Sequence, residues 1–144
     1  MPSSISLTES NEDYLETMYN LQRLKGVIRV KDIAEKMGVK PPSVVEAVKK
    51  LSEIKLVSYE KYGNITLSEK GIIVAKGIIN KHLILKNFLI LLGIDKDTAE
   101  EEACAMEHVL SVCTVNRLEK FTKFMERYSK DNEDIMELFA QFEE

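Results

Sequence analysis

The stretch VKDIAEKMGVKPPSVVEAVKKL, residues 30–51, decides the fold of this chain. Its first eight residues place apolar side chains at the spacing of a short amphipathic helix, and Gly38 follows where a helix commonly ends. Pro41 and Pro42 are tolerated in the first turn of a helix, because the backbone N–H groups that they lack would have no partner there. A helix, a glycine-containing turn and a second helix form a helix-turn-helix, with residues 42–54 as the recognition helix.

A short β-hairpin is predicted directly after this motif. Residues 57–62 (VSYEKY) alternate apolar and polar side chains, a Gly-Asn pair can make the turn, and residues 65–67 (ITL) can form the second strand. A two-stranded hairpin that follows a helix-turn-helix is a wing. The first half of the chain is therefore predicted to be a winged helix-turn-helix domain.

Long helices are predicted elsewhere in the chain. Residues 11–24 have one apolar face, with Ser10 or Asn11 as the N-terminal cap and Gly26 as the end. The remaining expected helices cover about residues 68–92, 97–112 (capped by Asp97 or Thr98), 115–128 and 132–142. The fold is thus expected to be mainly α. A winged helix-turn-helix domain in residues 1–70 would precede an all-helical domain in residues 71–144.

The helical domain has more apolar surface than one small domain needs to bury. The excess lies in one segment and comprises Ile78, Ile79, Leu83, Ile84, Leu85, Phe88, Leu89 and Leu91. Burial of such a surface against a second copy gives a homodimer. The same domain is therefore expected to carry the dimer interface.

Charge is distributed unevenly along the chain. The formal net charge is −4, which on its own argues against nucleic acid as a partner. Residues 18–70, however, contain 11 Lys and Arg against 6 Asp and Glu, whereas residues 71–144 contain 9 against 14. The basic segment coincides with the helix-turn-helix, so double-stranded DNA is the expected partner.

The chain carries no sign of a membrane or secretion segment. Its longest apolar stretch, residues 83–94, is interrupted by Lys86 and Asn87 and is too short to cross a bilayer. The N-terminal residues have neither a basic start nor an apolar run. The expected location is the cytoplasm, a reducing compartment in which Cys104 and Cys113 are not expected to form a disulfide and each is by default a small buried apolar residue.

The start of the recognition helix is expected to approach base edges in the major groove. The residues concerned are Lys40, Pro41, Pro42, Ser43 and Glu46. Cations further along suit phosphates, namely Lys49, Lys50 and Lys55 on or after the helix and Lys61, beside Tyr62, on the wing. Glu46 has the wrong charge for phosphate. It either accepts a hydrogen bond from cytosine N4 or takes no part, and the sequence leaves both open.

A possible metal site is indicated by Cys104, Glu107 and His108. Residues at i, i+3 and i+4 share one face of a helix, and this face borders apolar neighbours, so the three groups are expected to be half-buried. A thiol, a carboxylate and an imidazole together suit a borderline transition metal rather than calcium or magnesium. One helix offers only three ligands. Others are expected from the acidic pair Asp13 and Glu16 and from the second histidine, His82.

These residues also carry a resemblance to a known family. The segments NEDYLETMY (11–19) and EACAMEHVLS (102–111), the helix-turn-helix and His82 together resemble the metal-dependent repressors of the diphtheria toxin repressor and manganese transport regulator family. The resemblance covers nearly the whole chain. It implies a winged-helix domain, a helical dimerisation domain, a metal site between them, and repression of metal-uptake genes. The length is similar to that of the short manganese regulators, which lack the SH3-like domain of the iron-sensing members.

The resemblance also implies a ligand set of mixed type. Asp13, Glu16 and His82 match ligands of manganese regulators, and Glu107 and His108 match ligands of both branches. Cys104 departs from this pattern, because manganese regulators carry Glu there and iron regulators carry Cys. Lys86 stands where iron regulators have an ancillary acid, for which Glu100 or Glu101 could substitute. Manganese is slightly favoured, but the choice between Mn²⁺ and Fe²⁺ stays open.

The sequence admits two other functions. A winged-helix regulator could sense a small ligand or an oxidant through Cys104. A hydrolytic enzyme using Cys104 and His108 is disfavoured, because a nucleophile and a base four residues apart on a helix have poor geometry and no glycine-rich oxyanion loop is present. We therefore expect a regulator that is not an enzyme and takes no organic substrate.

Overall fold

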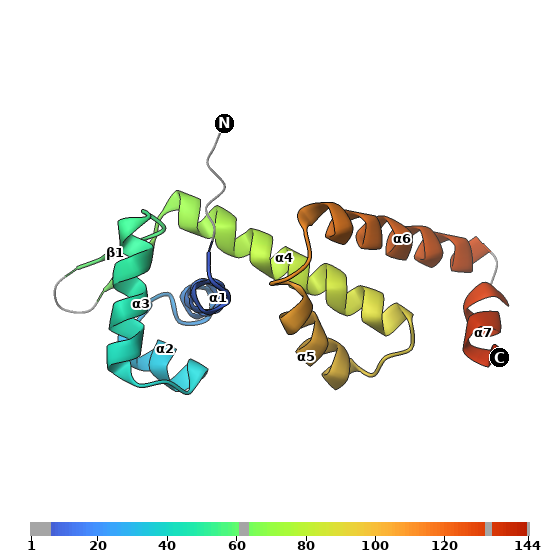
Figure 1. Ribbon diagram of the computed structural model, residues 1–144, viewed down its shortest axis with the longest axis horizontal. Coiled ribbons are helices and arrows are strands. Elements are labelled where there is room, and N and C mark those ends of the chain that lie inside the picture. Colours follow the sequence, from blue (N-terminus) through green and yellow to red (C-terminus); the bar gives the residue numbers. More distant parts are fainter. Residues whose placement is uncertain (1–6, 61–63, 132–133, 144) are drawn as a thin grey trace. The chain divides into compact units, whose positions relative to one another are not determined.

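The structure is a computed structural model that describes residues 7–60, 64–131 and 134–143. The elements in chain order are α1 (Glu9–Lys25), α2 (Val30–Met37), α3 (Pro41–Glu53), β1 (Val57–Tyr59), β2 (Ile65–Leu67), α4 (Glu69–Leu91), α5 (Lys96–Met106), α6 (Val112–Asp131) and α7 (Asp134–Gln141) (Figure 1). The chain divides into two compact units, residues 1–79 and 80–144. The division falls inside α4, so this helix contributes to both units.

The first unit is a winged helix-turn-helix, as the sequence predicts. Helices α1, α2 and α3 contact one another around a core whose most buried side chains are Leu15, Met18, Ile33, Val44, Val48 and Leu51. Strands β1 and β2 pair antiparallel, with Val57 opposite Leu67, and Ile28 forms an isolated bridge to Ile65. This bridge ties the segment between α1 and α2 to the wing.

In this unit, glycines follow the helix ends and prolines occupy a helix start, as the sequence predicts. Gly26 and Gly38 follow α1 and α2 in the left-handed conformation, with φ of 75° and 66°, which residues other than glycine rarely adopt. Helix α3 begins at Pro41. The cap of α1 differs from the prediction of Ser10 or Asn11. Thr8 takes this place, because its hydroxyl accepts a hydrogen bond of 3.1 Å from the Asn11 N–H and the helix starts earlier.

The start of α4 approaches the backbone between α3 and β1 closely at Gly71. A Cβ atom there would overlap the Leu56 carbonyl oxygen. Ser68 links the start of α4 to the segment after α3. Its hydroxyl accepts a hydrogen bond of 3.0 Å from the Gly71 N–H and donates one of 2.7 Å to the Lys55 carbonyl. Glycine is therefore required at position 71 by the space available, since its φ is not positive.

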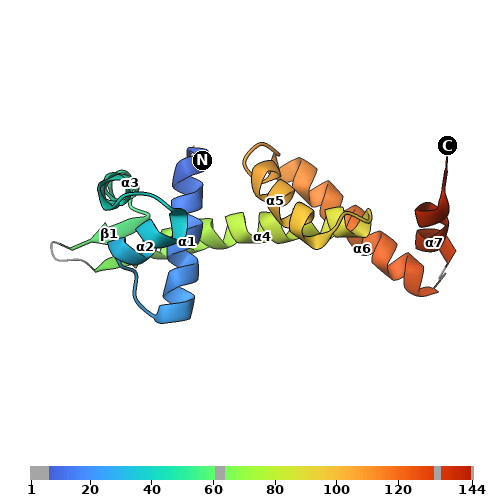
Figure 2. The ribbon, with the colours of Figure 1, turned by 90° about the horizontal axis from the view of Figure 1, so that it is seen from below.

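The second unit is helical, with a core formed by the last part of α4 together with α5 and α6 (Figure 2). Its most buried side chains are Leu85, Leu89, Ala99, Ala103 and Val115. Asp95 caps α5, with its carboxylate accepting from the Thr98 N–H at 3.0 Å and from the Thr98 hydroxyl at 2.6 Å. The predicted caps, Asp97 and Thr98, were therefore wrong by two or three residues.

Helix α5 ends at Met106, although the sequence predicted a helix to about residue 112. Residues 107–110 form a turn in which the Val109 N–H bonds the Met106 carbonyl at 3.1 Å. Lys81 of α4 donates to the Glu107 carbonyl at 3.0 Å. This carbonyl would accept a backbone N–H in a longer helix, so a side chain from a neighbouring helix takes over the role of the next turn.

The apolar segment of residues 78–91 is used largely inside the two units. Ile78 belongs to the core of the first unit, and Ile84, Leu85 and Leu89 belong to the core of the second. Exposed apolar side chains of the second unit include Leu83, Val109, Val112, Phe121, Phe124, Leu138, Phe139 and Phe142. Across the described residues, every helix is too short or too polar to span a lipid bilayer.

Candidate metal centre and DNA-binding surface

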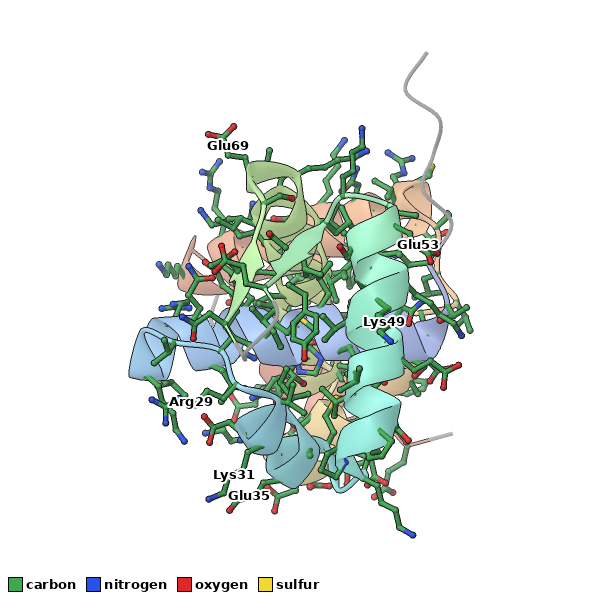
Figure 3. All side chains as sticks on the ribbon, turned by 90° about the vertical axis from the view of Figure 1, so that its left-hand side faces the viewer. Arg29, Lys31, Glu35, Lys49, Glu53 and Glu69 are labelled. Carbon is green, nitrogen blue, oxygen red and sulfur yellow. The ribbon has the colours of Figure 1, made fainter. Side chains whose placement is uncertain are left out.

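The predicted DNA-reading residues lie together at the exposed side and start of α3. Lys40 caps the helix with extended backbone angles, and Pro41 and Pro42 occupy its first turn. The exposed members of the predicted set are Lys40, Pro41, Pro42, Ser43, Glu46, Lys49 and Lys50. Figure 3 looks onto this unit and labels Lys49 on α3. Lys61 and Tyr62 lie outside the described residues, so the wing contact stays a prediction.

Glu46 has a partner within its own helix. Its carboxylate lies 3.5 Å from the Lys50 ammonium, and the two side chains are 71% and 62% exposed. An exposed pair at i and i+4 contributes only about 0.3–0.5 kcal/mol. Either group can therefore exchange this partner for a base or a phosphate at little cost.

Two exposed cations at the start of α2 were missed by the sequence analysis. Arg29 occupies the N-cap position of α2 and Lys31 lies in its first turn, and both are exposed and labelled in Figure 3. The first helix of a helix-turn-helix crosses the DNA backbone, where cations meet phosphates. The position of these two basic residues at the start of that helix was the signal that could have added them to the predicted DNA-binding set.

Cys104, Glu107 and His108 form a compact donor cluster, as their spacing predicts. The Cys104 Sγ, a Glu107 carboxylate oxygen and a His108 ring nitrogen all lie within 4.8 Å of one another. Cys104 comes from the last turn of α5, and the other two come from the turn after it. Their burial is unequal, since Glu107 is 1% exposed, the His108 side chain is 4% exposed and Cys104 is exposed. The expectation that cysteines here are buried was wrong for both Cys104 and Cys113.

The two carboxylate oxygens of Glu107 have different surroundings. Oε2 lies 2.9 Å from Nδ1 of His82, at hydrogen-bond distance. Oε1 lies 3.5 Å from Nε2 of His108 and has no hydrogen-bond partner among the residues that the structure describes. A buried carboxylate oxygen without a partner is costly. An ion held by this oxygen, the Cys104 thiolate and the His108 imidazole would remove that cost, and this donor set suits a borderline transition metal.

His82 is held on both ring nitrogens. Nε2 lies 2.8 Å from Oε1 of Glu100, and Glu100 also accepts from the Lys86 ammonium, which keeps the pKa of Glu100 below its ordinary value. The hydrogen bond with Glu107 contributes most to raising the pKa of His82 from 6.5 to about 9, against the opposing effect of burial. The i, i+4 spacing of His82 and Lys86 on α4, opposite acids on α5, was the signal for this network.

Asp13 and Glu16 lie on α1 in the first unit. They are three residues apart on one helix and both are half-buried. A half-buried pair of acids on one helix face has the form of a ligand pair, and their part in the metal site stays a prediction.

Fold and site together define a class of protein: a winged-helix DNA-binding regulator with a helical domain that carries a cluster of potential metal donors. Comparison with known families agrees over nearly the whole chain. Residues 6–65 match the N-terminal DNA-binding domain of the iron dependent repressors, and residues 68–136 match the metal-binding and dimerisation domain of the same family. The chain belongs to the iron-dependent repressor family and is a metal-dependent, DNA-binding transcriptional regulator.

Individual relatives support the same assignment. The chain is 42% identical over 124 residues to an uncharacterized HTH-type transcriptional regulator of Methanocaldococcus jannaschii, covering 85% of this chain and 97% of that one. It is 34% identical over 128 residues to the HTH-type transcriptional regulator MntR of Bacillus subtilis, covering 89% and 90%. The solved structure of the manganese regulator SloR matches with a TM-score of 0.71 and 39% identity over 82% of this chain. The chain spans only 55% of SloR.

Proposed function

We propose that this protein represses metal-uptake genes in the cytoplasm when Mn²⁺ or Fe²⁺ is plentiful. The observation that most supports this proposal is the environment of the buried Oε1 of Glu107. This oxygen has no hydrogen-bond partner among the described residues and lies close to donors of Cys104 and His108. Solved structures described as a manganese regulator and as a manganese-dependent transcriptional repressor are among its matches, which favours a divalent transition metal as the effector. The mixed donor set leaves Mn²⁺ and Fe²⁺ as the two candidates.

The proposed ligand set spans both halves of the chain. Cys104, Glu107 and His108 would hold the ion, with His82 beside them and with Asp13 and Glu16 of α1 completing the set. Residues 1–70 would read DNA, and residues 71–144 would dimerise and bind metal. A bound ion supplies positive charge that the acids of both segments share. The ion would thereby favour one arrangement of the two recognition helices of a dimer, matched to a palindromic operator.

The test is operator binding by the metal-free protein. Fluorescence anisotropy of a duplex from the chain's own upstream promoter is followed while Mn²⁺, Fe²⁺ (without oxygen), Zn²⁺ and Mg²⁺ are titrated at fixed salt. We expect Mn²⁺ or Fe²⁺, and not Mg²⁺, to tighten binding at least tenfold, which corresponds to about 1.4 kcal/mol. Equal affinity with and without every ion would contradict the proposal.

Variants assign the effect to the proposed ligands. Asp13→Ala and His108→Ala should each abolish the metal response while leaving the weak metal-free DNA binding intact. Glu102→Gln removes an exposed carboxylate of α5 and serves as the matched control, which should respond like the wild type. A full metal response in both Asp13→Ala and His108→Ala would exclude the proposed site.

Oxidant sensing through Cys104 is the second candidate, and the exposure of this thiol favours it. Metal-independent operator binding that peroxide abolishes, a reductant restores and Cys104→Ser makes insensitive would support this alternative. Catalysis forms no part of either proposal. The family consists of transcriptional regulators.

A further inference from the structure

A chain of alternating cations and anions runs beside the donor cluster, within the second unit. Its members are Lys86, Glu100, His82 and Glu107, which we call the polar chain. Lys86 bonds Oε2 of Glu100, Oε1 of Glu100 lies 2.8 Å from Nε2 of His82, and Nδ1 of His82 lies 2.9 Å from Oε2 of Glu107. Helix α4 contributes the two cationic members, and the acids come from α5 and its C-terminal cap.

Without Lys86, the outer end of this chain would be a second place for a metal ion. Glu100 and His82 offer a carboxylate and an imidazole in contact, which is a common pair of ligands for divalent transition metals. Glu107 stands behind them and already contributes one carboxylate oxygen to His82. The position beside Glu100 that such an ion needs is the position of the Lys86 ammonium.

The Lys86 ammonium is well placed to keep a divalent ion out. Its side chain is only 20% exposed, whereas that of Glu100 is 53% exposed. Charges shielded from water are screened less, so repulsion between the ammonium and a divalent ion is stronger here than between two surface cations. The ammonium also satisfies the carboxylate that would otherwise seek a cation.

We propose that Lys86 is a tethered substitute for a second metal ion, so that each chain binds a single transition-metal ion. This inference rests on the proposed function, because it presupposes the first ion at Cys104, Glu107 and His108. Lys86 acts through Glu100 and His82 as a positioning residue. It keeps Oε2 of Glu107 engaged with His82 and leaves Oε1, the oxygen without a hydrogen-bond partner among the described residues, for the metal.

The number of ions per chain tests this directly. The metal-free wild-type protein is dialysed against Mn²⁺ up to about a hundred times the first dissociation constant, and bound metal is measured by atomic absorption. Electron paramagnetic resonance of the same samples distinguishes isolated Mn²⁺ from magnetically coupled pairs. We expect one ion per wild-type chain and the spectrum of isolated Mn²⁺.

The charge-reversal variant Lys86→Glu should change this number. A carboxylate at position 86 would join Glu100 and His82 as a third ligand, so two ions per chain and a coupled spectrum are expected. Lys96→Glu reverses the charge of an exposed residue of α5 and should bind one ion like the wild type. Circular dichroism verifies that each variant is folded, and Lys86→Asp replaces Lys86→Glu if that variant does not fold.

The outcomes separate the inference from the proposed function. Two ions per wild-type chain would overturn the role of Lys86 and leave the metal-dependent function standing. One ion in both the wild type and the folded acidic variant would also overturn it, because Lys86 would then not be the excluding group. No bound Mn²⁺ in the wild type, and none in the same dialysis repeated with Fe²⁺ without oxygen, would instead contradict the proposed function itself.

Discussion

Glu107 is the buried carboxylate of the donor cluster. Its side chain is fully buried, and its two oxygens face different partners: Oε2 faces His82, while Oε1 faces His108 without a hydrogen bond. A buried charge that is only half satisfied costs stability. An unsatisfied buried polar atom in a native structure calls for an explanation, and a metal ion at Oε1 would supply one.

The variant Glu107→Gln should therefore lose metal-induced stabilisation. A ligand at a hundred times its dissociation constant stabilises the folded state by about 2.7 kcal/mol, which raises the thermal midpoint by several degrees. We expect the wild type to show this rise with Mn²⁺ and Glu107→Gln to show none at the same concentration. Differential scanning fluorimetry measures it, with Glu102→Gln as the control. A full rise in Glu107→Gln would mean that the ion binds elsewhere.

The metal-free protein should become less stable as the pH rises through the range in which His82 titrates. Its pKa is raised in the folded state to about 9, so its stabilising charge is fully present below pH 6.5 and is lost as the pH rises through 9. Urea unfolding in chelator should give a free energy of unfolding that falls by about 3 kcal/mol over this range. His82→Gln should flatten the profile, whereas Lys76→Gln on the exposed side of α4 should not. Parallel profiles for wild type and His82→Gln would refute the assignment.

At the scale of elements, local signals predicted the first unit well and the end of α5 poorly. Gly26, Gly38 and Pro41 act through their own backbone preferences, so sequence alone places the helix ends there. Helix α5 ends at Met106, and Lys81, 26 residues away from Glu107, satisfies the Glu107 carbonyl in place of a further helical turn. A contact of that range has no local signature. The i, i+3, i+4 spacing still brought the donor cluster together, because the turn after α5 continues the helical course for a few residues.

The junction of α3, β1 and α4 depends on the missing side chain at Gly71. Gly71→Ala would force a methyl group into the Leu56 carbonyl, and such overpacking destabilises by about 1–3 kcal/mol. Gly77→Ala lies in the same helix with nothing within 4 Å of the added Cβ, and should stabilise by about 0.5–1 kcal/mol. Urea denaturation of both variants checks the opposite signs. A Gly71→Ala protein as stable as the wild type would show that the junction is looser than described.

Helix α3 should contribute to DNA affinity through both charge and base contacts. Lys49 and Lys50 are exposed on α3, so replacing either by Gln should weaken binding to all sequences alike. The slope of log affinity against log salt should fall by about one for each phosphate that the variant no longer neutralises. Lys120→Gln on α6 is the control and should leave the slope unchanged. A change of sequence preference without a change of slope would assign base contacts to these lysines.

The whole molecule joins a DNA-binding domain to a metal-binding and dimerisation domain. The charge follows the same division, since residues 18–70 carry the excess of Lys and Arg and residues 71–144 the excess of Asp and Glu. The dimerisation domain leaves several large apolar side chains exposed, including Phe124, Phe139 and Phe142. The family's DNA-binding domain and its metal-binding domain match different segments of the chain, so any effect of metal on DNA binding is a coupling free energy between two sites.

Such a coupling must be reciprocal, whatever structural change carries it. If Mn²⁺ tightens operator binding tenfold, saturating operator DNA must tighten Mn²⁺ binding tenfold, which is about 1.4 kcal/mol in either direction. Isothermal titration of Mn²⁺ into the protein, with and without the operator duplex, measures the effect of DNA on Mn²⁺ affinity, and a scrambled duplex is the control. Glu107→Gln should show neither an effect of Mn²⁺ on operator affinity nor an effect of the operator on Mn²⁺ affinity. Operator binding that responds to Mn²⁺ without a matching gain in Mn²⁺ affinity would mean that the ion acts on the DNA or on the assembly of free chains, and not through the donor cluster of Cys104, Glu107 and His108.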